Sequence, residues 1–600
     1  MGPAWASLRA LAHLAALAAI VRVLGSLPSV LGRTLGPWLA DASPVYFALP
    51  LLAVLPLGGR LRWLAPLLAA GAVLLAEEPL ALRRQVLLVA ALSLYVAIGD
   101  GLLRRLGGVE RVPDSRPGLG RSCAAALLWA LVAAGAAGLS GRRPTGGLAE
   151  PFDARGRANL LLITLDTFRP DLLEAFGSTG DGTPHLDRFV REGTRIGHAI
   201  APAPHTHPSM ATILTGLVPG AHGSVVGRPH LDPSLSTLAE HLRRCGYRTA
   251  GFFENPWMTR EFGFDQGFET FVGGVSGRDP ASAAVDWLEE SAAAADGSAE
   301  RFYCHIHLFG AHGPYEPRSP WIDRWSPGYD GPYGRISNEQ LQAAELAGAV
   351  NFADEDKQRI VALYRSEAAA VDAEVGRVLA CLDRLEIDRD TLVVVTADHG
   401  EELFDHGGLH HGHTLHAELL SVPLILRWPG RLRANHLVRG PIGLVDLAPT
   451  VLDLLGLPKF APQPGCGSTR LPWLTGEEEW STLPPVASRR FLLRGQHLAA
   501  YVRQPWKLIV RWPVDPDAPW RPFDPGQDGG PQAQLFHLPD DSVEQSELAG
   551  LEPDVLARMI DEWQSSQLQG AWTPAGERTV SKDQLEALRG LGYAEVLEGR

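Results

Sequence analysis

The stretch from Thr391 to His416 constrains the fold of this chain more than any other. It opens with Leu392–Val395, an apolar and β-branched run that is long enough for a buried parallel strand and too short for a helix. Asp398 and His399 follow at the carboxyl end of that strand, which is the edge where open α/β sheets place their sites. The stretch therefore predicts an α/β fold with a polar site at this edge.

A polar loop with five further histidines follows the strand. They are His406, His410, His411, His413 and His416. Each has a simple interpretation as a solvated or hydrogen-bonded surface side chain. A buried Asp398–His399 pair needs a partner to offset its lost hydration, and its oxygen and nitrogen donors suit zinc or manganese in preference to calcium. We therefore expect one or two divalent metal ions here.

Strand-like and helix-like runs alternate from residue 158 onward. Strands are predicted at 160–165, 247–253, 302–308 and 422–426, and helices at 235–244, 355–385 and 444–455. This alternation indicates a mostly parallel sheet covered on both faces. Strand-like pieces at 499–503 and 506–511 follow a Pro- and Gly-rich passage. We therefore expect a linker at 146–157, a catalytic domain at 158–485 and a small α+β subdomain at 486–600.

Three more clusters of polar residues share the placement of Asp398 at strand ends. Asp166 ends the first predicted strand, and His307 and His312 lie at and just past the end of the third. Thr206 precedes a proline and a short helix, where threonine is a good helix cap. The alternative is that the Thr206 hydroxyl faces a metal at the positive end of this helix, which would stabilise an alkoxide and attract an oxyanion.

The first 145 residues differ in composition from the rest. They contain 14 arginines, no lysine and 6 acidic residues, a net charge of +8, so the remainder must carry −22 for the chain to total −14. Apolar runs of roughly 20 residues at 8–31, 41–59, 61–80, 84–103 and 120–140 predict about five transmembrane helices. The arginine distribution favours a multi-pass protein of a bacterial-type inner (plasma) membrane with its catalytic body on the periplasmic or extracellular side. That acidic body is poorly suited to nucleic acid.

Several segments, in order, resemble the motifs of the sulfatase family in the alkaline phosphatase superfamily. They are LLITLDTFRPD, THPSMATILTG, HLFGAHGPY, VVVTADHGEE and HGHTLHAELLSVPLILRWPG, followed by LVDLAPTVLDLLGLP and LEALRGLGYAE. The resemblance covers nearly all of 158–600. It implies an alkaline-phosphatase/sulfatase-like α/β sandwich with the metal site at the strand ends.

The resemblance also implies a role for particular residues. The implied metal ligands are Asp166, Thr206, Asp398 and His399, and Thr206 stands at the nucleophile position. His312 and His413 are implied to face the substrate or leaving group, or to help hold a second metal. A hydrogen bond to another side chain is the simpler role for these two histidines.

The chain departs from conventional sulfatases at the same motifs. Those enzymes have Cys or Ser at the position of Thr206, because that residue is converted to formylglycine, and threonine resists the conversion. Met210 replaces an arginine, and Thr167 replaces a second aspartate. The segment AGFFENPWM, which contains Asn255, lacks the Lys and His that contact sulfate. At these positions the chain instead resembles the threonine-using members of the superfamily. These are nucleotide pyrophosphatase-like hydrolases and the membrane phosphoethanolamine and glycerol-phosphate transferases.

The predicted function is therefore a membrane-anchored, metal-dependent hydrolase or transferase that acts on phosphate, phosphonate or sulfate esters through Thr206. Its expected partner is an anionic ester substrate, with a lipid or glycan head group as a candidate. Two alternatives stay open at this point. One is a sulfuric ester hydrolase of the arylsulfatase type that acts on sulfated glycans. The other is a catalytically silent membrane protein that binds a glycan or a partner, without stoichiometric metal.

Overall fold

The structure is a computed structural model of the chain, and it describes residues 158–274, 279–293, 300–347, 352–479, 483–493, 496–513 and 530–567. The chain divides into two compact units, residues 1–136 and 137–600, and all the described residues belong to the second. The predicted transmembrane region at 1–145 and the predicted linker at 146–157 lie outside the described residues.

The predicted localisation as a multi-pass inner-membrane protein is wrong as far as the structure describes the chain. Among the described residues, no helix combines the length and the apolar character needed to cross a bilayer. The longest described helix, α15 (Asp354–Arg384), has 31 residues but carries charged side chains along its length. The apolar runs that led to the prediction are not among the described residues.

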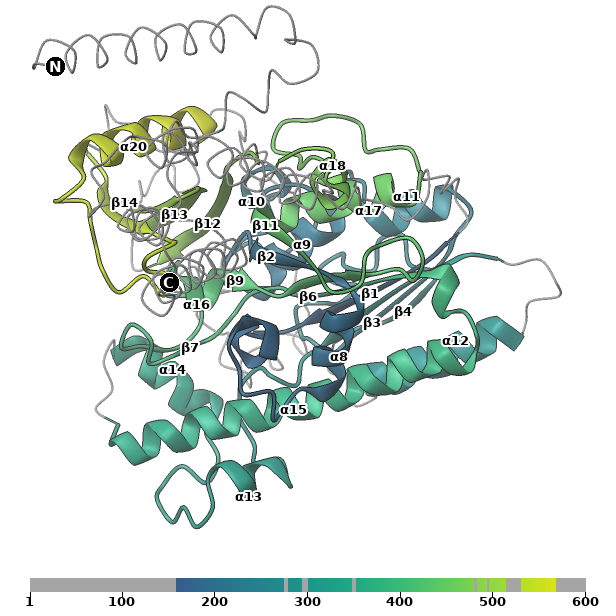
Figure 1. The fold of residues 1–600 in the computed structure, drawn as a ribbon, viewed down its shortest axis with the longest axis horizontal. Helices are drawn as coiled ribbons and strands as arrows, with labels where there is room; N and C mark the ends of the chain where they lie inside the picture. Colours follow the sequence, from purple (N-terminus) through teal and green to yellow (C-terminus); the bar gives the residue numbers. More distant parts are fainter. Residues whose placement is uncertain are drawn as a thin grey trace, which may run out of the picture. The chain divides into compact units, whose positions relative to one another are not determined.

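A sheet of nine described strands forms the centre of the catalytic part (Figure 1). The strand order is β11 (His436–Gly443), β2 (Thr194–Ile200), β10 (Leu424–Arg427), β6 (Thr391–Ala397), β1 (Asn159–Leu165), β5 (Phe302–Leu308), β3 (Arg248–Phe253), β4 (Thr270–Val272), with β9 (Ser421–Val422) paired to β2. Most neighbours pair in parallel, whereas β10 is antiparallel to β6 and β2, and β9 is antiparallel to β2. The predicted α/β fold with a mostly parallel sheet is confirmed.

The two central strands of the sheet explain why their sequences are continuously apolar. All seven residues of β6 and six of the seven in β1 are buried. Because helices cover both faces of the sheet, neither face favours the polar residues that an exposed strand would alternate with. The two strands pair in register from Asn159–Thr391 to Leu165–Ala397. Their carboxyl ends therefore meet at the same edge of the sheet.

Helices lie on both faces of this sheet (Figure 1). One face carries α8 (Pro184–Glu192), α12 (Pro280–Ala293) and α15, and the other carries α9 (Thr206–Thr215), α11 (Leu238–Arg244) and α17 (Leu447–Leu454). Shorter or peripheral helices are α10 (Pro219–His222), α13 (Trp321–Trp325), α14 (Asn338–Ala347), α16 (Ala417–Leu420) and α18 (Leu471–Thr475). The predicted helix at 355–385 is α15. The predicted helix at 444–455 is divided into a 3₁₀ turn at Leu444–Asp446 and α17.

The predicted strand at 422–426 is interrupted at Pro423, which separates β9 from β10. Proline has no main-chain N–H to donate to a neighbouring strand, so a continuous ladder cannot form through it. The carbonyl oxygen of Pro423 accepts a hydrogen bond from Thr396 Oγ1 at 2.7 Å instead. The chain thus pairs with β2 on both sides of this proline and adds the pairing with β6 after it.

A second, antiparallel sheet follows the main one. Its order is β12 (Val486–Leu493), β13 (Gln496–Arg503), β14 (Trp506–Pro513), β15 (Gln532–His537). Helix α20 (Pro553–Gln567) covers one face, where Met559 and Trp563 share a core with Leu508 and Val510. On the side of the main sheet, Ser488 Oγ of β12 donates to Ala201 O at 2.5 Å. The C-terminal sheet therefore packs directly on the catalytic part.

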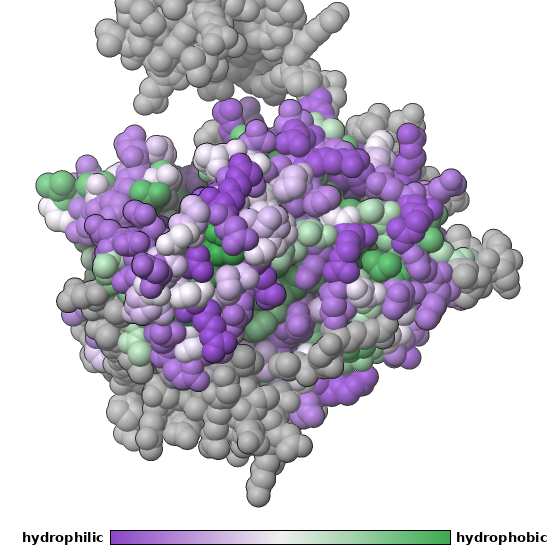
Figure 2. All heavy atoms as spheres, turned by 90° about the horizontal axis from the view of Figure 1, so that it is seen from below, coloured by the Kyte–Doolittle hydropathy of each residue, from purple (hydrophilic) through white to green (hydrophobic). Residues whose placement is uncertain are grey.

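The described surface is mainly hydrophilic in the view from below the sheet (Figure 2). Among the described residues, the exposed large hydrophobic side chains are Val543 and Leu551, at 61% and 77% exposure. The apolar residues of the predicted strands and helices are thus turned into the core, where their burial stabilises the fold.

Candidate active site

Asp166 and Asp398 lie side by side immediately beyond β1 and β6. The pairing of the two strands continues to this point, because the Asp398 N–H donates to Leu165 O at 3.3 Å. Asp398 Oδ1 accepts hydrogen bonds from the main-chain N–H groups of Thr167 (3.3 Å) and His399 (2.8 Å). One oxygen of Asp398 is therefore fixed by the backbone, and its other oxygen is directed elsewhere.

Asp166, Asp398 and His399 form a group that we call the carboxylate cluster. All three side chains are fully buried, and one ligand atom from each lies within 4.8 Å of the others. The His399 Nδ1–H donates to Gly400 O at 2.9 Å, which leaves Nε2 as the unprotonated nitrogen. That Nε2 lies 3.8 Å from Asp166 Oδ1 and 3.6 Å from Asp398 Oδ2.

The donors of the carboxylate cluster fit a divalent cation. Asp166 Oδ1 and Asp398 Oδ2 are buried and have no hydrogen-bond partner among the described residues. Burial and the neighbouring charge of Asp166 raise the pKa of Asp398 well above its ordinary value. Burial also acts to raise the pKa of Asp166, but nearby imidazoles, His312 first, lower it to about 2. A cation would offset the cost of two adjacent buried carboxylates, and two oxygens with one imidazole nitrogen suit zinc or manganese.

Thr206 is the first residue of α9 and joins this cluster. Its Oγ1 lies 3.4 Å from Asp166 Oδ2 and 3.4 Å from His399 Nε2, and the residue is 2% exposed. The residue at the N-cap of α9 is His205, so the hydroxyl of Thr206 does not cap this helix. The structure therefore brings together the four residues that the sequence predicted as metal ligands.

Asn255 and His307 hold the second oxygen of Asp166. Asn255 Nδ2 donates to Asp166 Oδ2 at 2.7 Å, and His307 Nε2 lies 3.2 Å from the same oxygen. Thr164 Oγ1 lies 2.9 Å from His307 Nδ1 and orients this ring from within the core. His307 was predicted at this edge of the sheet from its position at the end of β5, which lies next to β1, but no role was predicted for it or for Asn255.

A second group, the three-histidine cluster, adjoins the first. It comprises His312, His410 and His411, whose ligand nitrogens lie within 4.8 Å of one another. The His399 and His411 rings are 4.6 Å apart between centroids, so the two clusters share one site. Burial is the main cause that lowers the pKa of all three imidazoles below the ordinary value, which keeps them neutral near pH 7.

The orientation of the three-histidine cluster is set by groups behind it. His411 Nδ1 lies 2.9 Å from Glu401 Oε1, and Tyr315 OH donates to Glu401 Oε2 at 2.6 Å. The His312 Nδ1–H donates to Gly313 O at 2.6 Å. Because a carboxylate and a carbonyl oxygen only accept, both imidazoles are left with Nε2 as an acceptor. Glu401 and Tyr315 were not recognised from the sequence, since one is an acid among several and the other lies in a loop.

His413 is not part of this cluster. The resemblance implied that His312 and His413 face the substrate or help to hold a second metal, and the structure brings His410 and His411 to His312. His413 Nε2 lies 2.5 Å from Glu402 Oε2 within the loop. This contact is the simpler hydrogen-bonding role that the sequence analysis left open for it.

Comparison with known families establishes the class of this protein. The model of the sulfatase family matches residues 158–457. The chain belongs to the sulfatase family. Both clusters lie within the matched residues, and sulfatases are metal-dependent, in agreement with the buried Asp and His donors.

Similar proteins are ester hydrolases of the alkaline phosphatase superfamily. Arylsulfatase K of Canis lupus familiaris is 25% identical over 407 residues, which cover 59% of this sulfatase and 74% of that protein. Multifunctional alkaline phosphatase superfamily protein PehA of Trinickia caryophylli is 26% identical over 415 residues, covering 54% and 79%. The structure of phosphonate monoester hydrolase of Agrobacterium radiobacter superposes with a TM-score of 0.55 at 20% identity, covering 69% of this chain and 96% of that one. The predicted sulfatase-like fold and ester hydrolase class are confirmed.

Proposed function

We propose that this sulfatase-family enzyme hydrolyses phosphate or phosphonate esters with Thr206 as its nucleophile. The observation that carries the proposal is the position of the Thr206 hydroxyl, 3.4 Å from both Asp166 Oδ2 and His399 Nε2. Threonine is a secondary alcohol, so its oxidation cannot give the aldehyde on which conventional sulfatases act. An unmodified hydroxyl next to a cation site suits displacement at phosphorus.

The names of two similar proteins support phosphorus chemistry. One is a phosphonate monoester hydrolase, and the other is described as a multifunctional member of the alkaline phosphatase superfamily. Asn255, in the segment that lacks the sulfate-binding Lys and His of conventional sulfatases, contacts Asp166. The arylsulfatase relatives favour the second candidate, a sulfate ester hydrolase acting on sulfated glycans.

Four residues would hold the cation, namely Asp166, Asp398 and His399 with the hydroxyl of Thr206. When bound, zinc or manganese would lower the pKa of this hydroxyl and offset charge on the non-bridging oxygens of the ester. The positive end of the α9 dipole acts at the same place, because Thr206 is the first residue of that helix. A second ion would belong to the three-histidine cluster, and metal analysis would then find two ions per chain.

The chemistry of the chain's own residues then proceeds in two steps. In the first, a bond forms between Thr206 Oγ1 and phosphorus as the ester P–O bond breaks, and the hydroxyl proton ends on the leaving oxygen. We assign this proton transfer to His312, whose Nε2 is left as an acceptor. In the second, a bond forms between the water oxygen and phosphorus as the P–Oγ1 bond breaks, and the water proton passes through His411 Nε2 to Oγ1, which restores the Thr206 hydroxyl. Glu401 stabilises the imidazolium that forms, as the buried carboxylate partner of a catalytic histidine does.

Turnover of matched aryl esters tests the choice between phosphorus and sulfur. We expect kcat/KM for an aryl phosphonate or phosphate to exceed that for the aryl sulfate with the same leaving group by at least about 100-fold, because nothing at Thr206 supplies the modified nucleophile of conventional sulfatases. Using one leaving group for all esters removes differences in its departure. A preference for the sulfate would replace the proposal with the sulfate ester candidate.

A further inference from the structure

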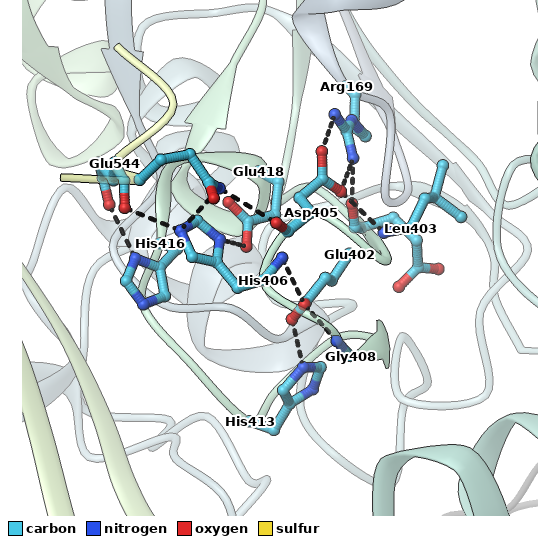
Figure 3. A network of polar contacts seen from close by, with 12 residues as sticks. Arg169, Glu402, Leu403, Asp405, His406, Gly408, His413, His416, Glu418 and Glu544 are labelled. Atoms are coloured by element: carbon cyan, nitrogen blue, oxygen red, sulfur yellow. Dashed lines mark hydrogen bonds and ion pairs between the residues drawn. The ribbon is translucent and has the colours of Figure 1, made fainter. Parts of the chain in front are cut away.

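The histidine loop, residues 401–416, contacts the C-terminal part at Glu544 (Figure 3) and at its neighbour Gln545, whose Nε2 donates to Asp405 O at 3.0 Å. Glu544 Oε2 lies 3.1 Å from His416 Nδ1, and the main-chain oxygen of Glu544 accepts from His406 Nε2 at 2.9 Å. The His406 and His416 rings stack with centroids 3.8 Å apart. Both ends of the segment from His406 to His416 are therefore fixed at one point, which restricts the residues between them.

Glu544 is itself held in place from the C-terminal sheet. Lys507 Nζ of β14 lies 2.6 Å from Glu544 Oε1, and the two residues are only 3% and 2% exposed. Burial acts to raise the pKa of Glu544, but Lys507 and His416 together hold it below the ordinary value. A buried carboxylate paired with a lysine on a regular strand cannot shift without leaving a charge unpaired. Glu544 is thus a fixed point relative to β14.

Acidic residues surround His406, the loop residue that binds the main-chain oxygen of Glu544. His406 Nδ1 lies 2.8 Å from Glu418 Oε1, and this hydrogen bond is the first cause that raises the pKa of His406 to about 9. Glu402, Glu544 and His416 are the other titratable residues beside it. Within the loop, Glu402 Oε1 also accepts from the His406 main-chain N–H at 3.0 Å. The charged His406 ring therefore donates to the Glu418 carboxylate and to the main-chain oxygen of Glu544 at neutral pH.

The first half of the histidine loop has a separate anchor. Arg169 donates to both oxygens of Asp405 at 2.6 and 2.9 Å, and to the main-chain oxygen of Glu401 at 3.1 Å (Figure 3). Arg169 follows β1 and does not depend on the C-terminal sheet. Loss of the Glu544 carboxylate should therefore loosen the end of the loop at His416 and the residues before it, whereas Arg169 keeps 401–405 in place.

The backbone of the histidine loop is strained at His410, a member of the three-histidine cluster. His410 has a φ of 80°, in the left-handed region that a non-glycine residue rarely adopts. Such a conformation persists where the surrounding structure enforces it. His410 belongs to the three-histidine cluster, so relaxation of this strain would move its imidazole away from His312 and shift His411 with it.

We propose that Glu544 is a positioning residue that fixes the histidine loop so that His410 and His411 meet His312. Glu544 lies between β15 and α20, outside residues 158–457, which the sulfatase family model matches, so the C-terminal part completes a site built on the main sheet. The proposal rests on the proposed function only in taking the three-histidine cluster as part of the active site.

The test compares Glu544→Ala with Glu544→Gln in the full-length protein. Glu544→Ala is expected to lower kcat at least about tenfold, which is less than the roughly 10²–10⁴-fold that general acid–base catalysis contributes because the histidines are displaced and not removed, with KM changed less than about threefold. The kcat is measured on whichever aryl ester the wild type hydrolyses fastest. Glu544→Gln still accepts from Lys507 and should recover most of this loss. By mass spectrometry, amide hydrogen exchange in Glu544→Ala should accelerate in peptides covering 406–416 and stay unchanged in 401–405.

The matched control is Asp540→Ala. It removes another carboxylate–histidine pair of the C-terminal part, His537 Nδ1 to Asp540 Oδ2 at 2.7 Å, and should change neither kcat nor exchange. Should Glu544→Ala fail to fold, His416→Phe keeps an aromatic ring beside His406 and is expected to show the same losses. The proposal is overturned if Glu544→Ala and His416→Phe both keep the kcat of the wild type. It is also overturned if their kcat falls while amide exchange at 406–416 stays unchanged. The exchange measurement needs no substrate, so it stands even if the phosphorus chemistry proves wrong.

Discussion

Thr206→Val is expected to lower kcat by at least about 10⁴-fold on every ester that the wild type hydrolyses. Valine replaces the hydroxyl with a methyl group of similar size, so the packing at the start of α9 is kept. The only group lost is the oxygen that lies 3.4 Å from Asp166 and His399. Steady-state kinetics with a chromogenic aryl ester measures the effect.

Thr206→Ser is the matched control for this variant. Serine keeps the hydroxyl on Cβ, so activity should stay within about tenfold of the wild type. Circular dichroism of both variants checks that each is folded. A Thr206→Val enzyme that retains activity close to the wild type would show that water or another side chain attacks the ester.

Asp398→Asn is expected to have opposite effects on stability with and without metal. The asparagine Oδ1 still accepts hydrogen bonds from the main-chain N–H groups of Thr167 and His399. An NH₂ group takes the place of Asp398 Oδ2, the buried oxygen without a partner, and can donate to Asp166. Because burial and Asp166 raise the pKa of Asp398, its charge at neutral pH is unfavourable in the metal-free protein. Removing that charge should raise the melting temperature in chelator by about 2–4 °C for each kcal/mol relieved.

With zinc or manganese present, the wild type should have a higher melting temperature than Asp398→Asn. The wild type gains stability by binding the cation, and Asp398→Asn binds it at least about 100-fold more weakly and loses activity. Metal content by atomic emission and melting curves with and without chelator measure both effects. If neither the melting temperature nor the activity of the wild type changes with chelator or added metal, the carboxylate cluster is not a cation site.

The sequence predicted the carboxylate cluster because its geometry follows from strand positions. Continuous apolar runs place β1 and β6 in the interior of a parallel sheet, and parallel strands end at one edge. Asp166 and Asp398 then have to meet, whatever the loops do. Thr206 needed the family resemblance, because capping a helix explains a threonine before a proline equally well.

The choice among the loop histidines could not be made from the sequence. The histidine loop has no periodicity, and its course depends on a positive φ at His410 and on contacts with Arg169 and Glu544, which lie far away in the chain. His410 and His411 are therefore in the site, whereas the predicted His413 binds Glu402. The same long-range contacts explain why Glu544 itself gave no signal in the sequence.

The most direct test of the account is mass spectrometry of protein quenched during turnover of an activated aryl phosphonate ester. We expect a phosphonyl adduct on the peptide that contains Thr206, and none in Thr206→Val. The adduct should accumulate further in His411→Ala, in which its release by water is slowed. A Thr206 peptide that stays unmodified in both the wild type and His411→Ala while product forms would contradict the account.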